Sequence, residues 1–329
     1  MNILLTGAGG FIGAHCLRYF LKHTNWNIVA LDSFYHKGTP QRIIDLVPNY
    51  NCDRVQIVKH DLTVPLDLPI IKKIGHIDIV INMASDSAVE RSGSDPRLCL
   101  INNYQLVINM LEYARVAKPA IFFQVSTDEV YGQAGPIQAH KEWDSIIPSN
   151  PYAASKSSQE SVAIAYWRCF GVPVVITNTV NNFGETQDPE KFLPKILQFA
   201  HNKKTMPVYK GGSRFYLYAD NHADVFIFLS QFTPTMYDGG KNQLPDRYNV
   251  TGGKELTNEE LIKEIVYLTN INIEYEIVDA ENFRPGYDKR YCLNGNKLYQ
   301  LGWKPPVNFE KGLKQTVTWS FNNKQWISI

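Results

Sequence analysis

The sequence predicts an α/β fold in which a doubly wound parallel sheet carries a smaller, discontinuous α/β region towards the C-terminus. Short apolar runs alternate with amphipathic helical segments through the first half of the 329-residue chain, as in strands joined by crossover helices. A glycine-rich turn lies between the first apolar run and the first helical segment. Beyond about residue 178, prolines, aromatic residues and polar loops become denser, which predicts the smaller region.

The predicted strands are short apolar runs of the kind found in sheets buried on both faces. They are residues 3–5, 27–31, 55–58, 77–81, 121–125 and 172–176. Helical periodicity marks the segments between and after them, at 11–21, 98–114, 152–170 and 258–269.

Composition excludes several classes of function. A net charge of +1 gives no reason to expect a nucleic acid or a membrane surface as partner. The five cysteines are scattered without a Cys-x-x-Cys pair, so neither a metal site nor a disulfide framework is expected. The chain enters a predicted strand at once, and no apolar run is long enough to span a bilayer. We therefore expect a cytoplasmic protein.

The glycine-rich turn has the spacing Gly-x-x-Gly-x-x-Gly, at Gly7, Gly10 and Gly13. Without β-carbons, the backbone N–H groups of such a turn can approach a pyrophosphate at a helix N-terminus, where the helix dipole also favours negative charge. Phe11 and Ile12 belong to the same turn. The alternative is a turn that only lets the helix pack closely on the strand.

Two carboxylates after successive predicted strands favour the dinucleotide interpretation. Asp32 ends the second strand, where it can accept hydrogen bonds from an adenosine ribose and would repel a 2′-phosphate, so NAD is preferred over NADP. Asp61 and Leu62 follow the third strand and could flank the adenine. We expect residues 1–178, with a returning segment at about 215–250, to form an NAD-binding Rossmann domain. Residues 179–214 and 251–329 would then bind the substrate.

Tyr152 and Lys156 are four residues apart near the start of a predicted helix, which places them on one face. The lysine, with a positive nicotinamide nearby, would stabilise a phenolate and lower the pKa of the tyrosine. Such a tyrosine can take a hydroxyl proton while a hydride leaves for NAD. The pair is common by chance on solvated helices, but it is informative downstream of a dinucleotide-binding turn.

Asp128 and Glu129 follow the predicted strand at 121–125. Burial and the proximity of like charges would raise the pKa of at least one of them and leave an acid beside a base. The alternative is a helix N-cap with a solvated neighbour.

These motifs together resemble the extended short-chain dehydrogenase/reductase superfamily. The run Ser126–Gly132 is more specific, because it resembles the signature of the dTDP-glucose 4,6-dehydratases, in which Thr-Asp-Glu is the catalytic trio. The resemblance spans nearly the whole chain, with further matching segments at 148–156, 178–184, 189–191, 284–286 and 301–305.

The resemblance implies a reaction on a sugar nucleotide. Tyr152 would deprotonate the C4 hydroxyl, with Thr127 hydrogen-bonded to the same oxygen and Lys156 holding the nicotinamide ribose, while a hydride passes to NAD. Glu129 would then remove the C5 proton and Asp128 would protonate the departing C6 hydroxyl, before the hydride returns to C6. The resemblance also implies a homodimer formed through the helices at 98–114 and 152–170.

Two alternatives stay open at this point. A sugar-nucleotide C4-epimerase or decarboxylase would share the NAD turn and the Tyr-Lys pair but lack the Asp-Glu pair. A non-catalytic NAD-sensing protein would tend to lose Tyr152 or Lys156, and both are present.

The resemblance further places ligand contacts along the chain. For the cofactor it adds Ala84 and Asn103 to the glycine turn, Asp32, Asp61 and Leu62. Arginine suits a diphosphate because its planar fork donates paired hydrogen bonds. The implied substrate contacts are Ser87, Ala88, Thr127, Asn182, Lys195, Arg214, Asn249, Arg284 and Tyr287.

Departures from the family pattern bear on the substrate. Ala88 stands where the family has a histidine beside the hexose, which predicts a bulkier sugar. UDP-N-acetylglucosamine is the favoured candidate, followed by UDP-glucose and dTDP-glucose. Phe215 and Tyr216 replace the usual Asp-Trp, so the base preference stays open. Dehydratases that invert C5 of UDP-N-acetylglucosamine carry lysine where this chain has Glu129, which favours retention but leaves coupled 5-epimerisation open.

Overall fold

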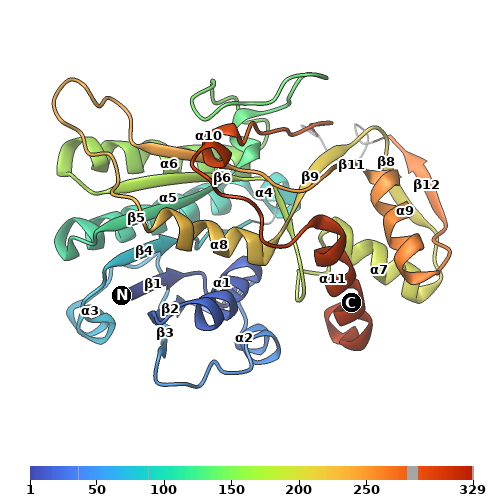
Figure 1. Cartoon of the computed structure of the whole chain (residues 1–329), viewed down its shortest axis with the longest axis horizontal. Helices are drawn as coiled ribbons and strands as arrows, with labels where there is room; N and C mark the ends of the chain where they lie inside the picture. The colour runs from blue at the N-terminus through green and yellow to red at the C-terminus, as the bar shows by residue number, and fades with distance from the viewer. Residues whose placement is uncertain (36, 88, 280–287, 328–329) are drawn as a thin grey trace.

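The computed structural model describes residues 1–35, 37–87, 89–279 and 288–327, and it arranges them around one large and two small β-sheets (Figure 1). The large sheet is parallel throughout, with strand order β10-β6-β5-β4-β1-β2-β3. Its strands are β1 (Asn2–Thr6), β2 (Asn27–Asp32), β3 (Val55–Lys59), β4 (Ile79–Asn82), β5 (Ile121–Thr127), β6 (Val174–Thr179) and β10 (Asp246–Val250).

The order of these strands reverses between β1 and β4. In doubly wound sheets the crevice at such a reversal, outside the carboxyl ends of the strands, is where ligands bind. The predicted fold class is therefore confirmed, and the sheet itself indicates where a site should lie. One expectation fails at the edge: β3 pairs with β2 alone, and Gln56 and Ile57 are exposed, so β3 is not buried on both faces.

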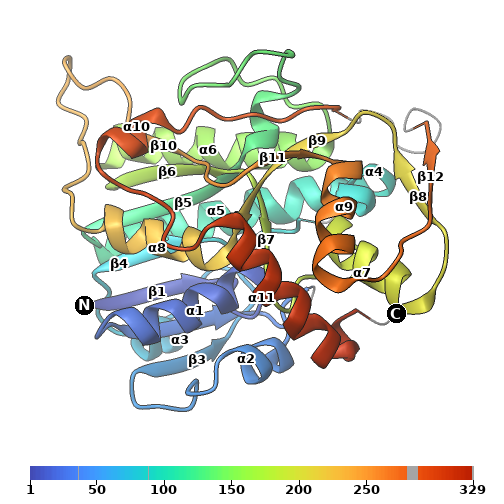
Figure 2. The same cartoon turned by 45° about the vertical axis from the view of Figure 1, so that its right-hand side comes forward.

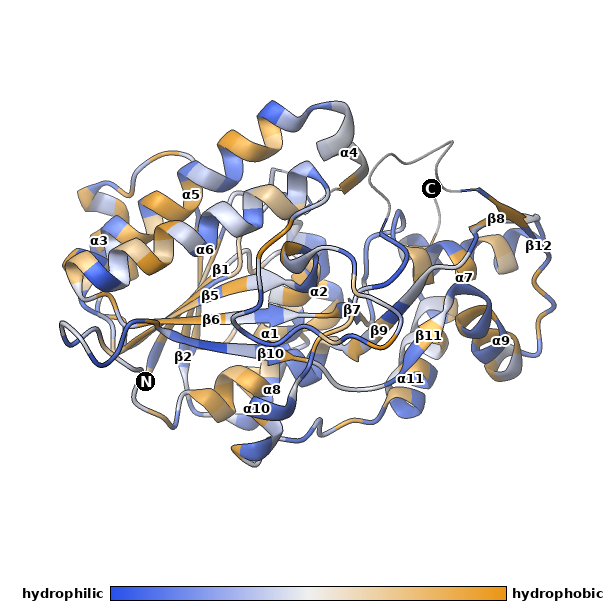
Figure 3. Ribbon diagram, turned by 90° about the horizontal axis from the view of Figure 1, so that it is seen from above, coloured by the Kyte–Doolittle hydropathy of each residue, from blue (hydrophilic) through white to orange (hydrophobic). Residues whose placement is uncertain are grey.

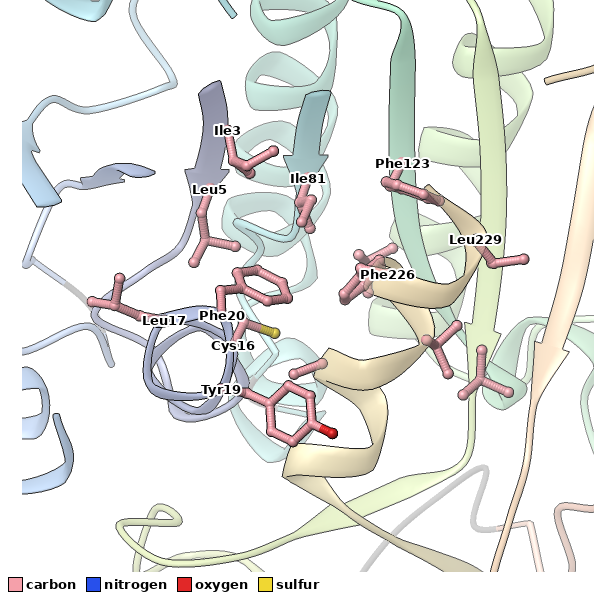
Figure 4. Close-up of a cluster of buried hydrophobic side chains, with 14 of the residues drawn as sticks. Ile3, Leu5, Cys16, Leu17, Tyr19, Phe20, Ile81, Phe123, Phe226 and Leu229 are labelled. Atoms are coloured by element: carbon pink, nitrogen blue, oxygen red, sulfur yellow. The ribbon is translucent and has the colours of Figure 1, made fainter. Parts of the chain in front are cut away.

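Helices cover both faces of the large sheet, because successive side chains of a strand point to opposite sides. Ile3 and Leu5 pack with α1 and α8 in the cluster drawn in Figure 4, whereas Leu4 packs with α5 and α6. The strands β5 and β6 between these layers are strongly hydrophobic (Figure 3). The covering helices are α1 (Phe11–His23), α2 (Pro40–Leu46), α3 (Leu68–Ile74), α5 (Pro96–Ala117), α6 (Pro151–Phe170) and α8 (Ala219–Leu229), and the short α4 (Val89–Ser94) packs on α5 and α6.

The smaller region lies to one side of the large sheet and has a hydrophobic core of its own (Figure 2). It contains a three-stranded sheet of order β11-β9-β7 and a parallel pair, β12-β8. Its strands are β7 (Asn181–Phe183), β8 (Met206–Tyr209), β9 (Ser213–Tyr218), β11 (Glu255–Thr257) and β12 (Tyr275–Val278). The helices around them are α7 (Phe192–Asn202), α9 (Asn258–Thr269) and α11 (Phe309–Asn322), while the short α10 (Asn296–Gln300) lies beside β10 and η3 (Lys324–Trp326) follows α11.

The chain crosses between the two regions more than once. After β7, β8 and β9 in the smaller region, it returns to the large sheet through α8 and β10. The domain boundaries predicted from the sequence stay a prediction. Among the described residues, no helix is both long enough and apolar enough to cross a membrane.

A buried ion pair fastens the edge strand β10 to α6. Nη2 of Arg247 lies 2.6 Å from Oε2 of Glu160, and the two side chains are at most 1% exposed. Arg247 also donates to the carbonyl oxygen of Glu142 at 3.0 Å and stacks over the ring of Trp143. Arg247 is thus the cation in direct contact with the Glu160 carboxylate, while the charge of the buried Lys156 acts on it from a greater distance.

We expect Arg247→Met to destabilise the fold by about 3–5 kcal/mol, because it leaves the Glu160 carboxylate buried without its counter-charge. Urea unfolding followed by circular dichroism would measure the loss. Lys254→Met is the matched control, since Lys254 pairs with Glu264 at the surface and its removal should cost much less. Adding Glu160→Gln to Arg247→Met should recover part of the stability. Equal losses in the two single variants would contradict this account.

Candidate active site

A cleft of about 680 Å³ opens at the carboxyl ends of the large sheet, at the reversal of strand order, and extends to the smaller region. Residues at the ends of β1, β2, β4, β5 and β6 line one side. Residues from the segment 181–195 and from β9 line the other. Most of the residues predicted to bind cofactor line it: Gly7, Gly10, Phe11, Ile12, Gly13, Asp32, Asp61, Leu62, Ala84, Tyr152 and Lys156.

The glycine turn needs its glycines for two physical reasons. Gly7 has φ +70°, in the left-handed region that side chains disfavour. A β-carbon on Gly13 would lie 2.1 Å from the carbonyl oxygen of Gly7, so α1 can rest on the turn only if this residue is glycine. None of the described side chains caps α1 at Gly10, and its first N–H groups are therefore available to an anionic group.

Carboxylates stand where an adenosine would meet the turn. Oδ2 of Asp32 accepts from the N–H of Gly9 at 2.9 Å, and Oδ1 accepts from the N–H of Phe34 at 2.8 Å. These bonds fix the carboxylate at the end of β2 while it still lines the cleft. Asp61 holds its own turn by accepting from Thr63, and it lines the cleft as well. Uncapped amides supply donors that suit the pyrophosphate of NAD, and a fixed carboxylate supplies an acceptor that suits its ribose hydroxyls.

The helix α6 brings Tyr152 and Lys156 to the same cleft. Nζ of Lys156 donates to the carbonyl oxygen of Val125 and to Oε1 of Gln159, each at 2.6 Å. The ammonium is almost fully buried, and this burial lowers the pKa of Lys156 to about 8. Lys156 is thus held at the end of β5 by two neutral oxygens.

The sequence predicted a lowered pKa for Tyr152, but the residues around it in the structure do not lower it. Burial of Tyr152, followed by the charges of Glu129 and Asp128, raises the pKa of the phenol, while a hydrogen bond with Thr127 acts weakly in the opposite direction. The physical reason is that the phenol is buried and has two carboxylates nearby, whereas the Lys156 ammonium is bonded to Val125 and Gln159.

The end of β5 and the short helix η1 (Asp128–Tyr131) carry the two carboxylates. Thr127, and not an aspartate, caps η1: its Oγ1 accepts from the N–H of Glu129 at 3.3 Å and donates to Oδ1 of Asp128 at 3.0 Å. The alternative of a carboxylate N-cap is therefore excluded. Asp128 lies beneath the cleft surface at 2% exposure, and its Oδ2 has no hydrogen-bond partner among the described residues.

Burial, together with the neighbouring charge of Glu129, raises the pKa of Asp128 to about 7. Glu129 itself lines the cleft, and its Oε2 accepts from Nδ2 of Asn150 at 2.9 Å. At neutral pH the first carboxyl can hold a proton, while the second faces the space in which a substrate would lie. The structure thus places a buried carboxyl with a raised pKa next to a carboxyl that lines the cleft, while their roles as acid and base stay a prediction.

Several residues expected to contact substrate line the far side of the cleft. Arg214 spans a turn by donating to the carbonyl oxygens of Ser213, Asp288 and Lys289, and it stacks over the ring of Tyr291 at 4.4 Å. Ala88, Arg284 and Tyr287 lie outside the described residues. The expected contacts that do line the cleft are Ser87, Thr127, Asn182, Lys195 and Arg214.

Two predicted contacts are placed elsewhere. Asn249 is fully buried, with Nδ2 donating to the carbonyl oxygens of His140 and Asn294. Asn103 is also fully buried, and it joins Asp86 to Ser155 through hydrogen bonds of 2.7 Å. Neither side chain lines the cleft, so the expectation of direct ligand contact does not match their placement.

Other residues reach the cleft without a signal in the local sequence. Tyr291 lies with its hydroxyl 3.5 Å from Oε2 of Glu129, although 162 positions separate them in the chain. Lys37 and Glu190 form an ion pair of 2.6 Å between lining residues of the two regions. Lys191 likewise donates to the carbonyl oxygen of Ser87 at 3.1 Å. The residues of each pair are far apart in the chain, so no local motif could have predicted these contacts.

Comparisons with known proteins agree with this geometry. The family model described as GDP-mannose 4,6 dehydratase matches residues 4–316. A dTDP-glucose 4,6-dehydratase of Haemophilus influenzae is 32% identical, over 98% of each protein. The low-salt glycan biosynthesis protein Agl12 of Haloferax volcanii is also 32% identical, over 96% of this chain and 97% of that protein.

Solved structures extend the agreement to three dimensions. DesIV, a dTDP-glucose 4,6-dehydratase of Streptomyces venezuelae whose structure contains NAD, aligns with a TM-score of 0.86 at 30% identity, covering 99% of this chain and 98% of that one. A UDP-glucuronic acid 4-epimerase of Bacillus cereus aligns with a TM-score of 0.87 at 23% identity, which shows a shared fold alone.

The predicted cofactor and enzyme class are thereby confirmed: the cofactor is NAD, and the enzyme is a hydro-lyase that acts on a nucleotide sugar. The chain belongs to the extended short-chain dehydrogenase/reductases, and within them to the NAD-dependent nucleotide-sugar 4,6-dehydratase family.

Proposed function

We propose that Thr127, Asp128, Glu129, Tyr152 and Lys156 convert a UDP- or dTDP-hexose to its 4-keto-6-deoxy form in the cleft described above. The observation that carries this assignment is the pair at the end of β5: a buried Asp128 whose pKa is raised to about 7, directly beside a Glu129 that faces the cleft. An oxidation alone would need only Tyr152 and Lys156, whereas a loss of water needs both an acid and a base.

The first part of the reaction takes place at C4 of the hexose. The residues of the chain raise the pKa of Tyr152, so its phenolate needs the positive charge of bound NAD beside it. This phenolate takes the proton of the C4 hydroxyl, and Thr127, at the adjacent end of β5, hydrogen-bonds to the same oxygen. NAD supplies the redox chemistry, since it accepts a hydride from C4 and later returns it to C6. Lys156 would hold the nicotinamide ribose, and the uncapped N–H groups of α1 the pyrophosphate.

The second part is an elimination across C5 and C6. The new C4 ketone acidifies the C5 proton, which Glu129 takes, and the electron pair of that C–H bond forms the C5–C6 double bond. The C6–O bond breaks as Asp128 gives its proton to the departing hydroxyl, which leaves as water. Glu129 then returns its proton to C5 while C6 is reduced. One water is lost and no net oxidation occurs. Before the next turnover Tyr152 gives up the proton it took and Asp128 regains one, so the enzyme also returns to its starting state.

The diphosphate and the sugar would lie against the side of the cleft formed by the smaller region. Lys195 and Arg214 supply positive charge there, and Asn182 supplies an amide. Arg214 is already held by three backbone carbonyl oxygens, so it would meet a phosphate with little loss of side-chain freedom.

Two observations point to different hexoses. The relatives named dTDP-glucose 4,6-dehydratase, at about 30% identity over nearly the whole chain, support dTDP-glucose. The alanine at position 88 supports UDP-N-acetylglucosamine, the sugar favoured from the sequence, but this residue lies outside the described part of the structure. We take dTDP-glucose as the first candidate and the UDP-sugars as the next.

We also propose that the enzyme acts in the cytoplasm as a homodimer joined through α5 and α6. These two helices pack against each other, and α5 leaves the apolar side chains of Leu98, Ile101 and Tyr104 more than 40% exposed. Their spacing of three residues places them along one side of the helix. A second copy of the same pair would cover them.

We expect Glu129→Gln to stop the reaction after C4 oxidation, because an amide cannot take the C5 proton. Turnover should fall by about 100- to 10,000-fold, while enzyme-bound NADH accumulates and is seen by its near-ultraviolet absorbance. Tyr152→Phe is the matched control, since it should block the earlier step and produce no NADH. Wild-type turnover by Glu129→Gln would refute the assigned role.

The raised pKa of Asp128 also makes a prediction about stability. The folded-state pKa of about 7 exceeds the unfolded value, so stability is full below about pH 4 and falls as the pH rises towards 7, by about 4 kcal/mol at most. Asp128→Asn removes this charge. We expect the variant to be inactive yet more stable than wild type at about pH 8, with little difference at about pH 4.

Thermal unfolding of both proteins across this pH range would measure the effect. Asp53→Asn, at an exposed carboxylate, is the control and should show no such dependence on pH. A constant difference between Asp128→Asn and wild type at every pH would show that Asp128 is ionised throughout.

The substrate can be identified by incubation with dTDP-glucose, UDP-glucose and UDP-N-acetylglucosamine, followed by NMR of the products. We expect one of them to yield a 4-keto-6-deoxy sugar with C5 retained, because Glu129 gives the proton back to the face from which it took it. Turnover of UDP-N-acetylglucosamine in preference to dTDP-glucose would favour the interpretation based on Ala88. Inversion at C5 would show that a second group reprotonates that carbon.

A further inference from the structure

One side chain, that of Asn150, connects the two halves of the proposed mechanism. Asn150 is the N-cap of α6, the helix that carries Tyr152 and Lys156, and its Oδ1 accepts from the N–H of Ala153 at 2.9 Å. Its Nδ2 donates to Oε2 of Glu129, also at 2.9 Å. A single amide therefore joins the start of the tyrosine helix to the carboxylate on η1.

The bond from Asn150 determines which oxygen of Glu129 is presented to the substrate. The two described contacts of this carboxylate, Nδ2 of Asn150 and the more distant hydroxyl of Tyr291 at 3.5 Å, both reach Oε2. Among the described residues, no hydrogen bond reaches Oε1. Because Glu129 lines the cleft and Asn150 lies behind it, Oε1 is the oxygen left to take a proton.

Capping alone does not require an asparagine at this position. Serine, threonine and aspartate also accept the N–H bonds of a helix start, and in this chain Thr39, Asp67 and Asp95 cap α2, α3 and α5. A donor that reaches a carboxylate while the same side chain caps a helix does require the amide, which has an oxygen on one side and an NH₂ group on the other.

The backbone around Asn150 is held from both directions, so the amide has little freedom to turn. Its carbonyl oxygen accepts from the N–H of Ala154 at 3.0 Å, as the first bond of α6. The preceding Ser149 donates its hydroxyl to the carboxylate of Asp288 in the smaller region. Pro151 follows at the first helical position and fixes the entry of the helix.

We propose that Asn150 is a positioning residue for the removal of the C5 proton. It holds Glu129 at a fixed distance from Tyr152, so that the group acting at C4 and the group acting at C5 address neighbouring carbons of one sugar ring. The inference rests on the function proposed above. It adds that the elimination depends on the bond from Nδ2 of Asn150 to Glu129. The oxidation depends only on the bond that Oδ1 accepts at the start of α6.

The test compares Asn150→Ser and Asn150→Asp with wild type. Serine retains the cap but is too short to reach Glu129, whereas aspartate retains both the cap and the length but turns an oxygen towards Oε2. With substrate and NAD-loaded enzyme in rapid mixing, we expect NADH to form within about 3-fold of the wild-type rate. The loss of water, and the exchange of the C5 hydrogen with solvent deuterium, should slow by about 10- to 100-fold.

Asn308→Ser is the matched control. Asn308 caps α11 through the same type of bond, 2.9 Å to the N–H of Lys311, and α11 packs in the core of the smaller region. We expect this variant to carry out both steps at wild-type rates. A further variant tests the route of the effect: Asn150→Ser should add no loss to Glu129→Gln, because the group it positions has already lost its function.

The outcomes separate this inference from the function on which it rests. Turnover by Glu129→Gln would refute the role of Glu129 itself. The role of Asn150 alone would be refuted by two results together. Glu129→Gln would stop after C4 oxidation, and both Asn150→Ser and Asn150→Asp would eliminate water at the wild-type rate. Equal slowing of NADH formation and elimination in the two Asn150 variants would show that the residue serves the helix alone, and would also overturn the proposal.

Discussion

The carboxylate of Glu160 holds together the four elements on which the site is built. It lies one turn beyond Lys156 on α6 and is fully buried. Oε2 accepts from Arg247 of β10 at 2.6 Å, and Oε1 accepts from Nδ2 of Asn178 of β6 at 2.7 Å. The same amide group of Asn178 donates to the carbonyl oxygen of Thr127, at the end of β5, at 3.1 Å.

This arrangement explains how Asp128, Glu129 and Tyr152, which the proposed reaction uses as acid, base and proton acceptor, are held in one site although they come from two elements. Asp128 and Glu129 are adjacent in sequence, yet one lies beneath the surface and the other lines the cleft. Burial, followed by the neighbouring charge of Glu129, raises the pKa of Asp128 to about 7. Tyr152 comes from a different element, and its placement relative to them depends on contacts between α6 and the end of β5. Buried polar groups at these contacts leave few alternative arrangements.

Much of the fold and part of the site could be predicted from the sequence, because both are encoded locally. The helix predicted at 258–269 has the same bounds as α9, and the glycine turn lies where its spacing placed it. The periodicity of apolar residues cannot show that β3 is an edge strand, since that depends on which strands lack a second neighbour.

The site was predicted where a motif is continuous, and missed where it depends on distant segments. Thr127, Asp128 and Glu129 form one run, and Tyr152 and Lys156 form another. Tyr291 and Asn150 reach Glu129 only through the folding of the smaller region and the start of α6. The ligand contacts expected of Asn103 and Asn249 were wrong for the opposite reason. The position of each residue matches the family pattern, but its side chain is already hydrogen-bonded to backbone carbonyl oxygens and neighbouring side chains.

The contacts across the rim of the cleft have a consequence for how the enzyme is supplied with cofactor. Lys37 pairs with Glu190, and Lys191 bonds to the backbone of Ser87, so the two regions are joined over the cleft between them. A dehydrogenase must release its reduced nucleotide after every turnover, and bonds across the cleft would slow that release. A catalyst that gives its hydride back to the same molecule has no such need, so its rate is independent of the ratio of oxidised to reduced nucleotide around it.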